Sequence, residues 1–351
     1  MWRYSTGRPA LTHFKESFAM NTIPADGVRV PARVIPFPQS ISIEAQAALR
    51  RLVNADGMPL NALHCPPHPE DFNGWMRLKA AADAQYEAAM AQMAGQLRAS
   101  VETVEVGGAT VHIAIPTSPL AEDAIYVDLH GGGMVFGGGA VCRIGAQMQA
   151  DQLGLRCWGI DYRMPPEHPY PAALDDCLAV YRRLLQQYSP QNIVVGGRSA
   201  GGNLAAAMLL RARDEGLPLP AALVLLSPEV DLTESGDSFA LNQLVDVLLP
   251  RPLMSNNLLY AADADLAHPY LSPLFGDFSR GFVPTFIQSG TRDLFLSNAV
   301  RLHRALRRVS VPCELHIFEA MPHGGFMGAP EDSELRAEVA RFVHAHLPAP
   351  G

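Results

Sequence analysis

From residue 124 onward the sequence alternates short apolar runs with longer helix-like runs, and this alternation constrains the fold more than any other feature. The runs predicted as strands are Ala124–Leu129, Arg156–Ile160, Asn192–Val195, Ala221–Leu226, Pro284–Gln288 and Cys313–Phe318. The helix-like runs are Ala140–Gln152, Pro171–Tyr188, Ala200–Asp214, Ala299–Val309 and Glu331–His346. Because short apolar strands joined by helices need cover on both faces, the pattern predicts an α/β fold with a mostly parallel central sheet and helices on both faces.

The stretch before this alternation has a different character. Residues 41–54 and 69–97 repeat Ala, Gln, Met and Leu at spacings of three and four, which predicts two helices. Gly107 and Gly108 then separate two β-like runs within residues 101–115, which predicts a hairpin.

One segment does not fit the alternation. Residues 232–275 lie between two predicted strands and are too long for an ordinary connection, so we expect them to form a lid. We divide the chain into residues 1–98, an N-terminal arm with helices, and residues 99–351, the main α/β domain. Residues 1–19, which precede a second methionine, are interpreted as a dispensable extension.

The composition narrows the classes of partner. The 351-residue chain has a formal net charge of -8 and no basic run, so we expect neither nucleic acid nor a membrane as a partner. Its five cysteines are scattered without CxxC spacing, and no apolar leader segment precedes them. This pattern is typical of a reducing compartment and predicts a cytoplasmic protein. The sequence leaves the choice between a monomer and a homodimer open.

The segment Gly197-Arg198-Ser199-Ala200-Gly201 carries the chemistry. It is a G-x-S-x-G motif between a predicted strand and an Ala- and Leu-rich helix. A serine on such a turn has its hydroxyl exposed in a strained backbone, and the flanking glycines are needed because a Cβ would clash there. The following helix directs its N-terminus toward the serine, which favours negative charge at that point.

A second glycine-rich loop follows an earlier strand. His130 is followed by Gly131, Gly132 and Gly133, and three successive glycines leave backbone N–H groups free to face an oxyanion. A phosphate-binding loop is the competing interpretation. It is disfavoured because Phe136 stands where G-x-G-x-x-G needs glycine and no Lys-Ser or Lys-Thr pair follows.

A serine nucleophile needs a base and an orienting acid, expected downstream in the order acid, then histidine. His323 directly follows the last predicted strand, and Asp293 follows the strand before it. Loops at the carboxyl ends of strands carry the site in this architecture, so we expect these two residues. Asp231, one strand earlier, is the weaker candidate acid. The other downstream histidines are His268, His303, His316, His344 and His346.

These motifs, together with the segment 161–176, resemble the hormone-sensitive-lipase-like bacterial esterases (family IV) of α/β-hydrolase fold. The resemblance covers residues 99–348. It implies a Ser-His-Asp triad of Ser199, His323 and Asp293, an oxyanion hole built from the N–H groups of Gly132, Gly133 and Ala200, and a helical cap. Residues 1–98 and 232–275 would contribute to that cap, and residues 99–351 would be the catalytic domain.

The sequence departs from the family at several places. Arg198 stands where the family often has Asp, and Glu229 where it often has an aromatic residue. Both follow neighbouring strands, so we expect either an ion pair between them or two solvated side chains. Gly325 is inserted before Phe326, and Leu294 replaces the proline that usually follows the acid.

The resulting expectation is hydrolysis of a small-molecule carboxylic ester of short to medium acyl chain, through an acyl-enzyme. Neither a cofactor nor a metal is required, and the loop residues His64, Cys65 and His68 are interpreted as no metal site. A lactone hydrolase with the same triad is the alternative enzyme. A non-catalytic small-molecule receptor is the alternative from another class, since plant gibberellin receptors resemble this family but lack the triad histidine.

Overall fold

The structure is a computed structural model that describes residues 26–249 and 253–348. It divides into two compact units, residues 1–35 and 36–351. In the first unit, residues 26–35 are described and contain neither helix nor strand. The proposed extension at residues 1–19 lies outside the described residues. The division of the chain at residue 98 stays a prediction.

An eight-stranded sheet forms the centre of the second unit, in the order β1-β2-β4-β3-β5-β6-β7-β8. The strands are β1 (Ser100–Val106), β2 (Ala109–Ile115), β3 (Ile125–Leu129), β4 (Arg156–Asp161), β5 (Ile193–Arg198), β6 (Ala222–Leu226), β7 (Thr285–Gly290) and β8 (Cys313–Phe318). The pairs β1–β2 and β2–β4 are antiparallel, and all other pairs are parallel. The predicted hairpin and the predicted mostly parallel sheet are both confirmed.

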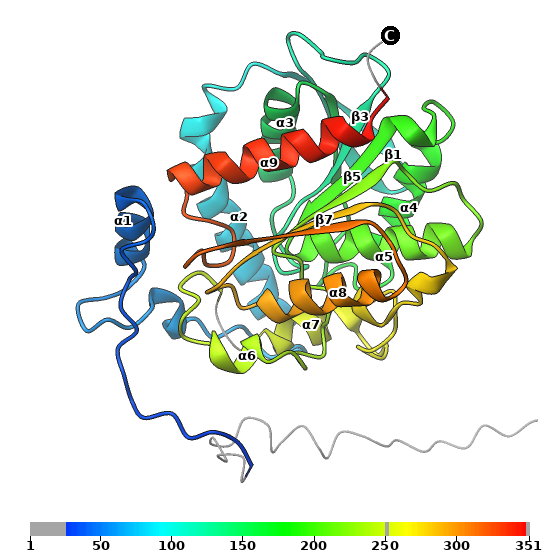
Figure 1. Ribbon diagram of the computed structural model, residues 1–351. Helices are drawn as coiled ribbons and strands as arrows, with labels where there is room; N and C mark the ends of the chain where they lie inside the picture. Colours follow the sequence, from blue (N-terminus) through cyan, green and yellow to red (C-terminus); the bar gives the residue numbers. More distant parts are fainter. Residues whose placement is uncertain (1–25, 250–252, 349–351) are drawn as a thin grey trace, which may run out of the picture. The chain divides into compact units, whose positions relative to one another are not determined.

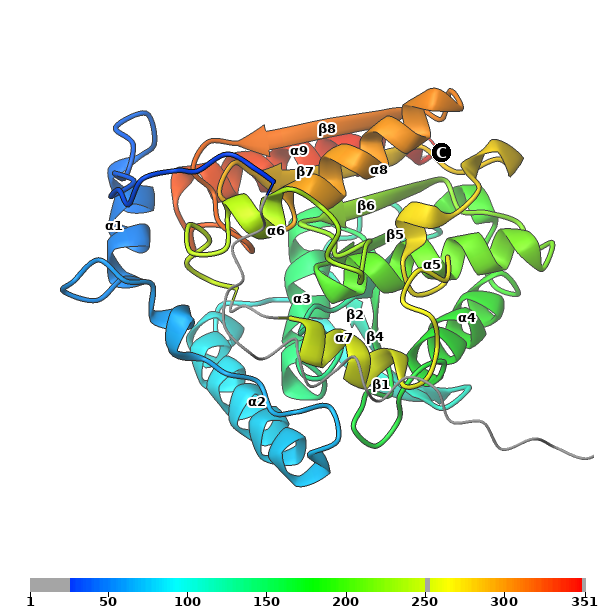
Figure 2. The same ribbon diagram turned by 90° about the horizontal axis from the view of Figure 1, so that it is seen from below.

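Helices cover both faces of this sheet, as predicted (Figures 1 and 2). On one face lie α3 (Ala140–Leu153) and α9 (Pro330–His346), and on the other α4 (Ala172–Leu184), α5 (Ala200–Asp214) and α8 (Leu296–Arg308). Successive strand residues alternate between the two cores. Val194 and Val224 join the core under α3 and α9, whereas Val195 and Leu225 join the core under α4, α5 and α8.

Two further helices precede the sheet, α1 (Ile43–Arg51) and α2 (Phe72–Ala94), with a short 3-10 turn, η1 (Leu60–Leu63), between them. The hydroxyl of Ser42 caps α1 by accepting a hydrogen bond from the N–H of Ala45. Ser42 also donates two hydrogen bonds of 2.7 Å, from its N–H and its hydroxyl, to the carboxylate of Glu331 at the start of α9. These contacts hold α1 beside the N-terminal end of α9.

The long segment between β6 and β7 contains no strand in its described part. It forms two short helices, α6 (Ser238–Leu241) and α7 (Met254–Ala261), and two 3-10 turns, η3 (Pro273–Phe275) and η4 (Phe278–Arg280). Helix α7 lies beside the loop that follows β3, because the side chain of Asn256 donates a hydrogen bond to the carbonyl of Gly133. The assignment of this segment as a lid stays a prediction.

Candidate active site

Ser199 lies on the sharp turn between β5 and α5. Its backbone angles are φ 57° and ψ -121°, a region that a residue with a side chain rarely occupies. A Cβ on Gly197 would lie 2.3 Å from the carbonyl oxygen of Gly201, and a Cβ on Gly201 would lie 1.9 Å from the carbonyl oxygen of Leu129. Both motif glycines are therefore required by close approaches of the backbone, as the sequence predicts.

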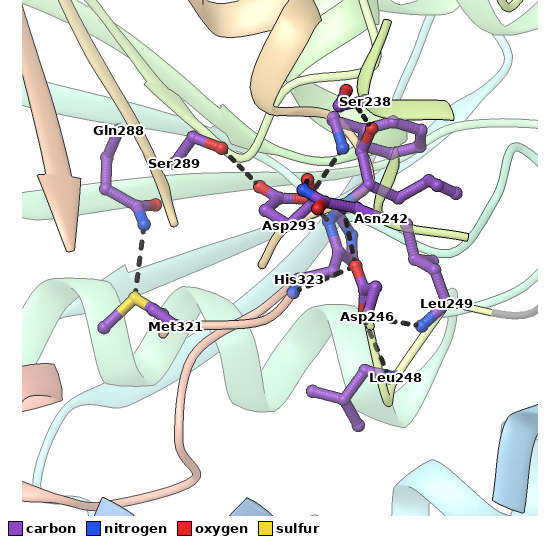
Figure 3. Close-up of polar contacts among 12 residues, drawn as sticks. Ser238, Asn242, Asp246, Leu248, Leu249, Gln288, Ser289, Asp293, Met321 and His323 are labelled. Atoms are coloured by element: carbon purple, nitrogen blue, oxygen red, sulfur yellow. Dashed lines mark hydrogen bonds and ion pairs between the residues drawn. The ribbon is translucent and has the colours of Figure 1, made fainter. Parts of the chain in front are cut away.

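Asp293 and His323 meet where β7 and β8 end. The Nδ1 atom of His323 lies 3.2 Å from Oδ1 of Asp293, and the carboxylate also accepts hydrogen bonds from the Ser289 hydroxyl at 2.7 Å and from the Phe295 N–H at 2.9 Å (Figure 3). Asp293 is fully buried. Burial by itself raises the pKa of this carboxyl, but the charge of His323 and these hydrogen bonds outweigh burial and hold the pKa below its usual value. Asp293 is therefore a charged acceptor that orients the imidazole.

Ser199 is 7% exposed and lies against the glycine loop that follows β3. A Cβ on Gly131 would be 3.4 Å from the Cβ of Ser199. In the described part of the chain, the Ser199 hydroxyl makes no hydrogen bond to His323. Hydrogen bonds between a nucleophile and its base are often long in ligand-free enzymes and tighten when substrate binds.

The glycine loop has the backbone form expected of an oxyanion-binding segment. Gly132 and Gly133 have φ values of 133° and 56°, and a Cβ on Gly132 would lie 1.8 Å from the carbonyl oxygen of Phe136. Among the described residues, none accepts a hydrogen bond from the N–H of Gly132 or Gly133. The N–H of Ala200, the first residue of α5, has no partner within its helix either.

Side chains from three elements hold this loop in place. Asn256 of α7 donates to the carbonyl of Gly133 at 3.2 Å, and Asp83 of α2 accepts from the N–H of Gly137 at 2.7 Å. The hydroxyl of Tyr162 donates to the carbonyl of His130 at 2.7 Å, and the two rings stack at 4.2 Å. The position of the loop therefore depends on α2, on α7 and on the segment that follows β4.

The structure brings Asp293, and not the alternative Asp231, to His323. Asp231 is also fully buried, but its two oxygens accept hydrogen bonds from Thr233, Ser235 and Arg301. The remaining downstream histidines lie elsewhere: His303 on α8, His316 on β8, His344 and His346 on α9, and His268 in the segment after α7.

The proposed ion pair between Arg198 and Glu229 is wrong. Arg198 faces the α3 and α9 side, where its charged neighbours include Asp332 and Asp128. Glu229 is 2% exposed and lies near Asn257, and its Oε1 has no hydrogen-bond partner among the described residues. Burial raises the pKa of Glu229 to about 8, so this carboxyl is protonated at neutral pH. The alternative, that both side chains are solvated, also fails because both are largely shielded from water.

A second buried carboxylate, Asp246, lies beside the site and was not predicted from the sequence. Its Oδ2 accepts hydrogen bonds from the N–H groups of Leu294 at 2.8 Å and His323 at 3.2 Å (Figure 3). A lone aspartate within the apolar run Leu244–Leu249 is the sequence signal that could have indicated it.

Comparisons with known proteins identify the family of this fold. A family model described as the α/β hydrolase fold matches residues 126–327. An acetyl-hydrolase of Streptomyces hygroscopicus is 34% identical over 224 residues, which are 63% of this chain and 74% of that protein. The crystal structure of an esterase called E25 superimposes with a TM-score of 0.83 at 34% identity, covering 92% of this chain and 99% of the other.

The crystal structure of an esterase from the bacterial hormone-sensitive lipase family superimposes with a TM-score of 0.74 at 29% identity, covering 88% of this chain and 99% of that one. None of the helices described here is both long enough and apolar enough to span a bilayer. The fold, the matched region and the relatives lead to one assignment: the chain belongs to the α/β-hydrolase fold family, among its hormone-sensitive-lipase-like carboxylesterases.

Proposed function

We propose that this protein is a serine carboxylesterase that hydrolyses short- to medium-chain esters with Ser199 as nucleophile, His323 as general base and Asp293 as the orienting acid. The observation that carries the proposal is the hydrogen bond of 3.2 Å between His323 and Asp293, in loops at the same sheet edge as the strained turn of Ser199. A nucleophile, a base and an acid in loops at the carboxyl ends of parallel strands of one sheet are the arrangement that acyl transfer needs.

In the acylation step, Nε2 of His323 takes the proton of the Ser199 hydroxyl while the oxygen attacks the ester carbonyl carbon. The carbonyl π electrons move to the oxygen and form a tetrahedral oxyanion. When that intermediate collapses, the C–O bond to the alcohol breaks and His323 returns its proton to the departing alkoxide. Asp293, charged and buried, stabilises the imidazolium during both transfers.

In the deacylation step, a water molecule gives a proton to His323 and its oxygen attacks the acyl carbon. Collapse of the second tetrahedral intermediate releases the carboxylic acid and returns the proton to Ser199. The oxyanion of both intermediates would accept hydrogen bonds from the N–H groups of Gly132, Gly133 and Ala200. Removal of one such donor costs about 10²–10³-fold in rate in a comparable site.

We expect the helical cap to determine which esters the enzyme accepts. Helix α2 supports it, because Asp83 holds the N–H of Gly137 and the ring of Tyr86 lies 5.6 Å from that of Phe136, next to the oxyanion loop. Trp75 of the same helix is fully buried and donates to the carbonyl of His68, so its ring packs in the protein interior. The similarity to a protein named acetyl-hydrolase supports a short acyl group.

The test is hydrolysis of p-nitrophenyl esters from acetyl to long acyl chains, in EDTA, by the wild type and by Ser199→Ala. Ser227→Ala is the matched control, because Ser227 is fully buried at the end of the neighbouring strand and its hydroxyl has no partner among the described residues. We expect Ser199→Ala to lose several orders of magnitude in rate, Ser227→Ala to retain activity, and the wild type to prefer short chains. Equal rates in Ser199→Ala and wild type would overturn the proposal.

A further inference from the structure

Asp246 is a buried carboxylate that contacts both the loop of Asp293 and the loop of His323. It is fully buried, and its two oxygens accept four backbone hydrogen bonds. Oδ1 accepts from the N–H groups of Leu248 at 2.9 Å and Leu249 at 3.2 Å, within its own turn. Oδ2 accepts from those of Leu294 and His323, in the loops that follow β7 and β8. Because a carboxylate has about four lone-pair sites, Asp246 is fully occupied in joining these three segments.

The residues before Asp246 reinforce the same junction. Asn242, one helical turn earlier, donates from its side chain to the carbonyl of Asp293 at 2.8 Å and to that of Thr291 at 3.3 Å. The hydroxyl of Ser238 donates to the carbonyl of Leu294 at 2.6 Å. We call residues 238–249 the clamp segment. Its side chains bind both the N–H and the C=O groups of the loop that carries Asp293, which fixes that loop in position and orientation (Figure 3).

The clamp segment is itself anchored from the N-terminal side of the chain. Asn61, in the 3-10 turn η1, donates from its amide to the carbonyls of Asp246 at 3.0 Å and Leu249 at 2.6 Å. Asn61 is buried, and the segment is thus held on both sides. All of these hydrogen bonds join groups of the protein itself. They therefore hold the catalytic loop in position whether or not substrate is bound.

Asp246 also brings charge to the site. Asp246 and Asp293 are both fully buried and both lie beside His323. Burial raises the pKa of Asp246 to about 6, with a further rise from the charge of Asp293, opposed by His323 and the backbone N–H groups. Arg292, the neighbouring cation on the same loop, turns away to the carbonyl of Pro36. Two cation-forming groups of the described structure act on these carboxylates: His323, whose charge interacts with both, and the buried Arg198, whose charge interacts with that of Asp293.

We propose that Asp246 is a positioning residue of the esterase reaction: it fixes the loops of Asp293 and His323 to the clamp segment and, as a second buried anion, stabilises the imidazolium that forms when His323 takes the proton of Ser199. The inference rests on the proposed function, and it adds a residue that touches neither the substrate nor the reacting atoms. It predicts a defect in kcat with little change in KM, because the substrate contacts stay intact.

The test is the pH dependence of kcat/KM for Asp246→Asn against the wild type. Loss of the charge makes protonation of His323 less favourable, so the acidic limb of the profile moves to lower pH by about one unit. We expect kcat to fall roughly tenfold to a hundredfold through the loosened loops. The matched control is Asp332→Asn. Asp332 is a buried carboxylate that accepts the N–H groups of Phe326, Gly328 and Ala329 in the loop after His323.

Asp332→Asn is expected to lower stability and to leave the acidic limb where it is in wild type. An unshifted limb in Asp246→Asn, in an enzyme whose activity still depends on Ser199, would overturn the role of Asp246 and leave the proposed function intact. Loss of Ser199 dependence would instead overturn the proposed function itself.

A measurement on the wild type covers the case in which Asp246→Asn does not fold. The proton between His323 Nδ1 and Asp293 gives a low-field NMR resonance whose shift follows the charges around it. Two titration steps, one of them near the pKa of about 6 of Asp246, support the proposal. A single step, assigned to His323, contradicts it.

Discussion

Replacement of Glu229 by Gln is predicted to change the pH dependence of the free energy of unfolding, by an amount that follows from the raised pKa of this buried side chain. Glu229 is 2% exposed, and burial, together with the charges of Glu234 and Asp231, raises its pKa from 4.5 to about 8. Between these two pH values the unfolded chain has released the proton and the folded chain still holds it. The unfolded state then binds fewer protons, so stability falls as pH rises through this window and becomes constant above pH 8.

Integrated between pH 5 and pH 9, this linkage lowers the free energy of unfolding of the wild type by about 4 kcal/mol relative to a variant that cannot ionise at this position. Glu229→Gln keeps the size and the hydrogen-bonding oxygen but carries no titrating proton. The stability of the variant relative to wild type is therefore expected to rise by about 4 kcal/mol over the same range.

The assay is urea unfolding of both proteins at pH 5, 7 and 9, with the slope of each transition compared to verify that the same surface is exposed. Glu331→Gln is the control, because hydrogen bonds from Ser42 outweigh desolvation and hold the pKa of Glu331 below its usual value. A group of that kind loses its contribution only as pH falls, so its difference from wild type stays flat between pH 5 and 9. Parallel loss of stability in wild type and Glu229→Gln would refute the reasoning.

Three further changes test the site. Gly201→Ala forces a Cβ to within 1.9 Å of a backbone carbonyl that cannot move freely, so we expect a loss of about 3 kcal/mol or more in urea unfolding, or no folded protein. Asp293→Asn leaves His323 without its charged partner and is expected to lower kcat by about 10⁴-fold. The Tm of the variant is measured in parallel to verify that it is folded. A loss of kcat below tenfold would contradict the role of Asp293. Asn256→Ala removes the hydrogen bond to the oxyanion loop and is expected to lower kcat roughly tenfold on p-nitrophenyl acetate, whereas an unchanged kcat would show that the loop is fixed without it.

The elements that could be predicted are those whose cause is local in the sequence. The strands and helices of the sheet follow from the period of apolar residues, and the turn at Ser199 follows from glycines that stand where a Cβ would clash. The first residue of α8 was predicted less accurately. That helix begins at Leu296, three residues before the apolar pattern, since the loop around Asp293 turns directly into it.

The features that could not be predicted depend on the direction of side chains and on distant backbone groups. Arg198 ends β5 and Glu229 lies three residues beyond the end of the neighbouring strand β6. The side chain of Arg198 projects to the face covered by α3 and α9, whereas that of Glu229 lies close to Asn257. Asp246 acts on the N–H groups of loops 48 and 77 residues away, and no spacing in the sequence marks such contacts. Its only trace is a carboxylate in an apolar run.

The central claim is that Ser199 carries the acyl group during turnover. The most direct measurement is rapid mixing of the wild type with excess p-nitrophenyl acetate, followed by acid quenching and mass spectrometry of the peptide that contains Ser199. The account predicts a burst of p-nitrophenol approaching one equivalent per chain if deacylation is slow, and an acetyl group on Ser199 in the quenched wild type that is missing from Ser199→Ala. An acetyl group on another residue, or p-nitrophenol released at the same rate by Ser199→Ala, would contradict it.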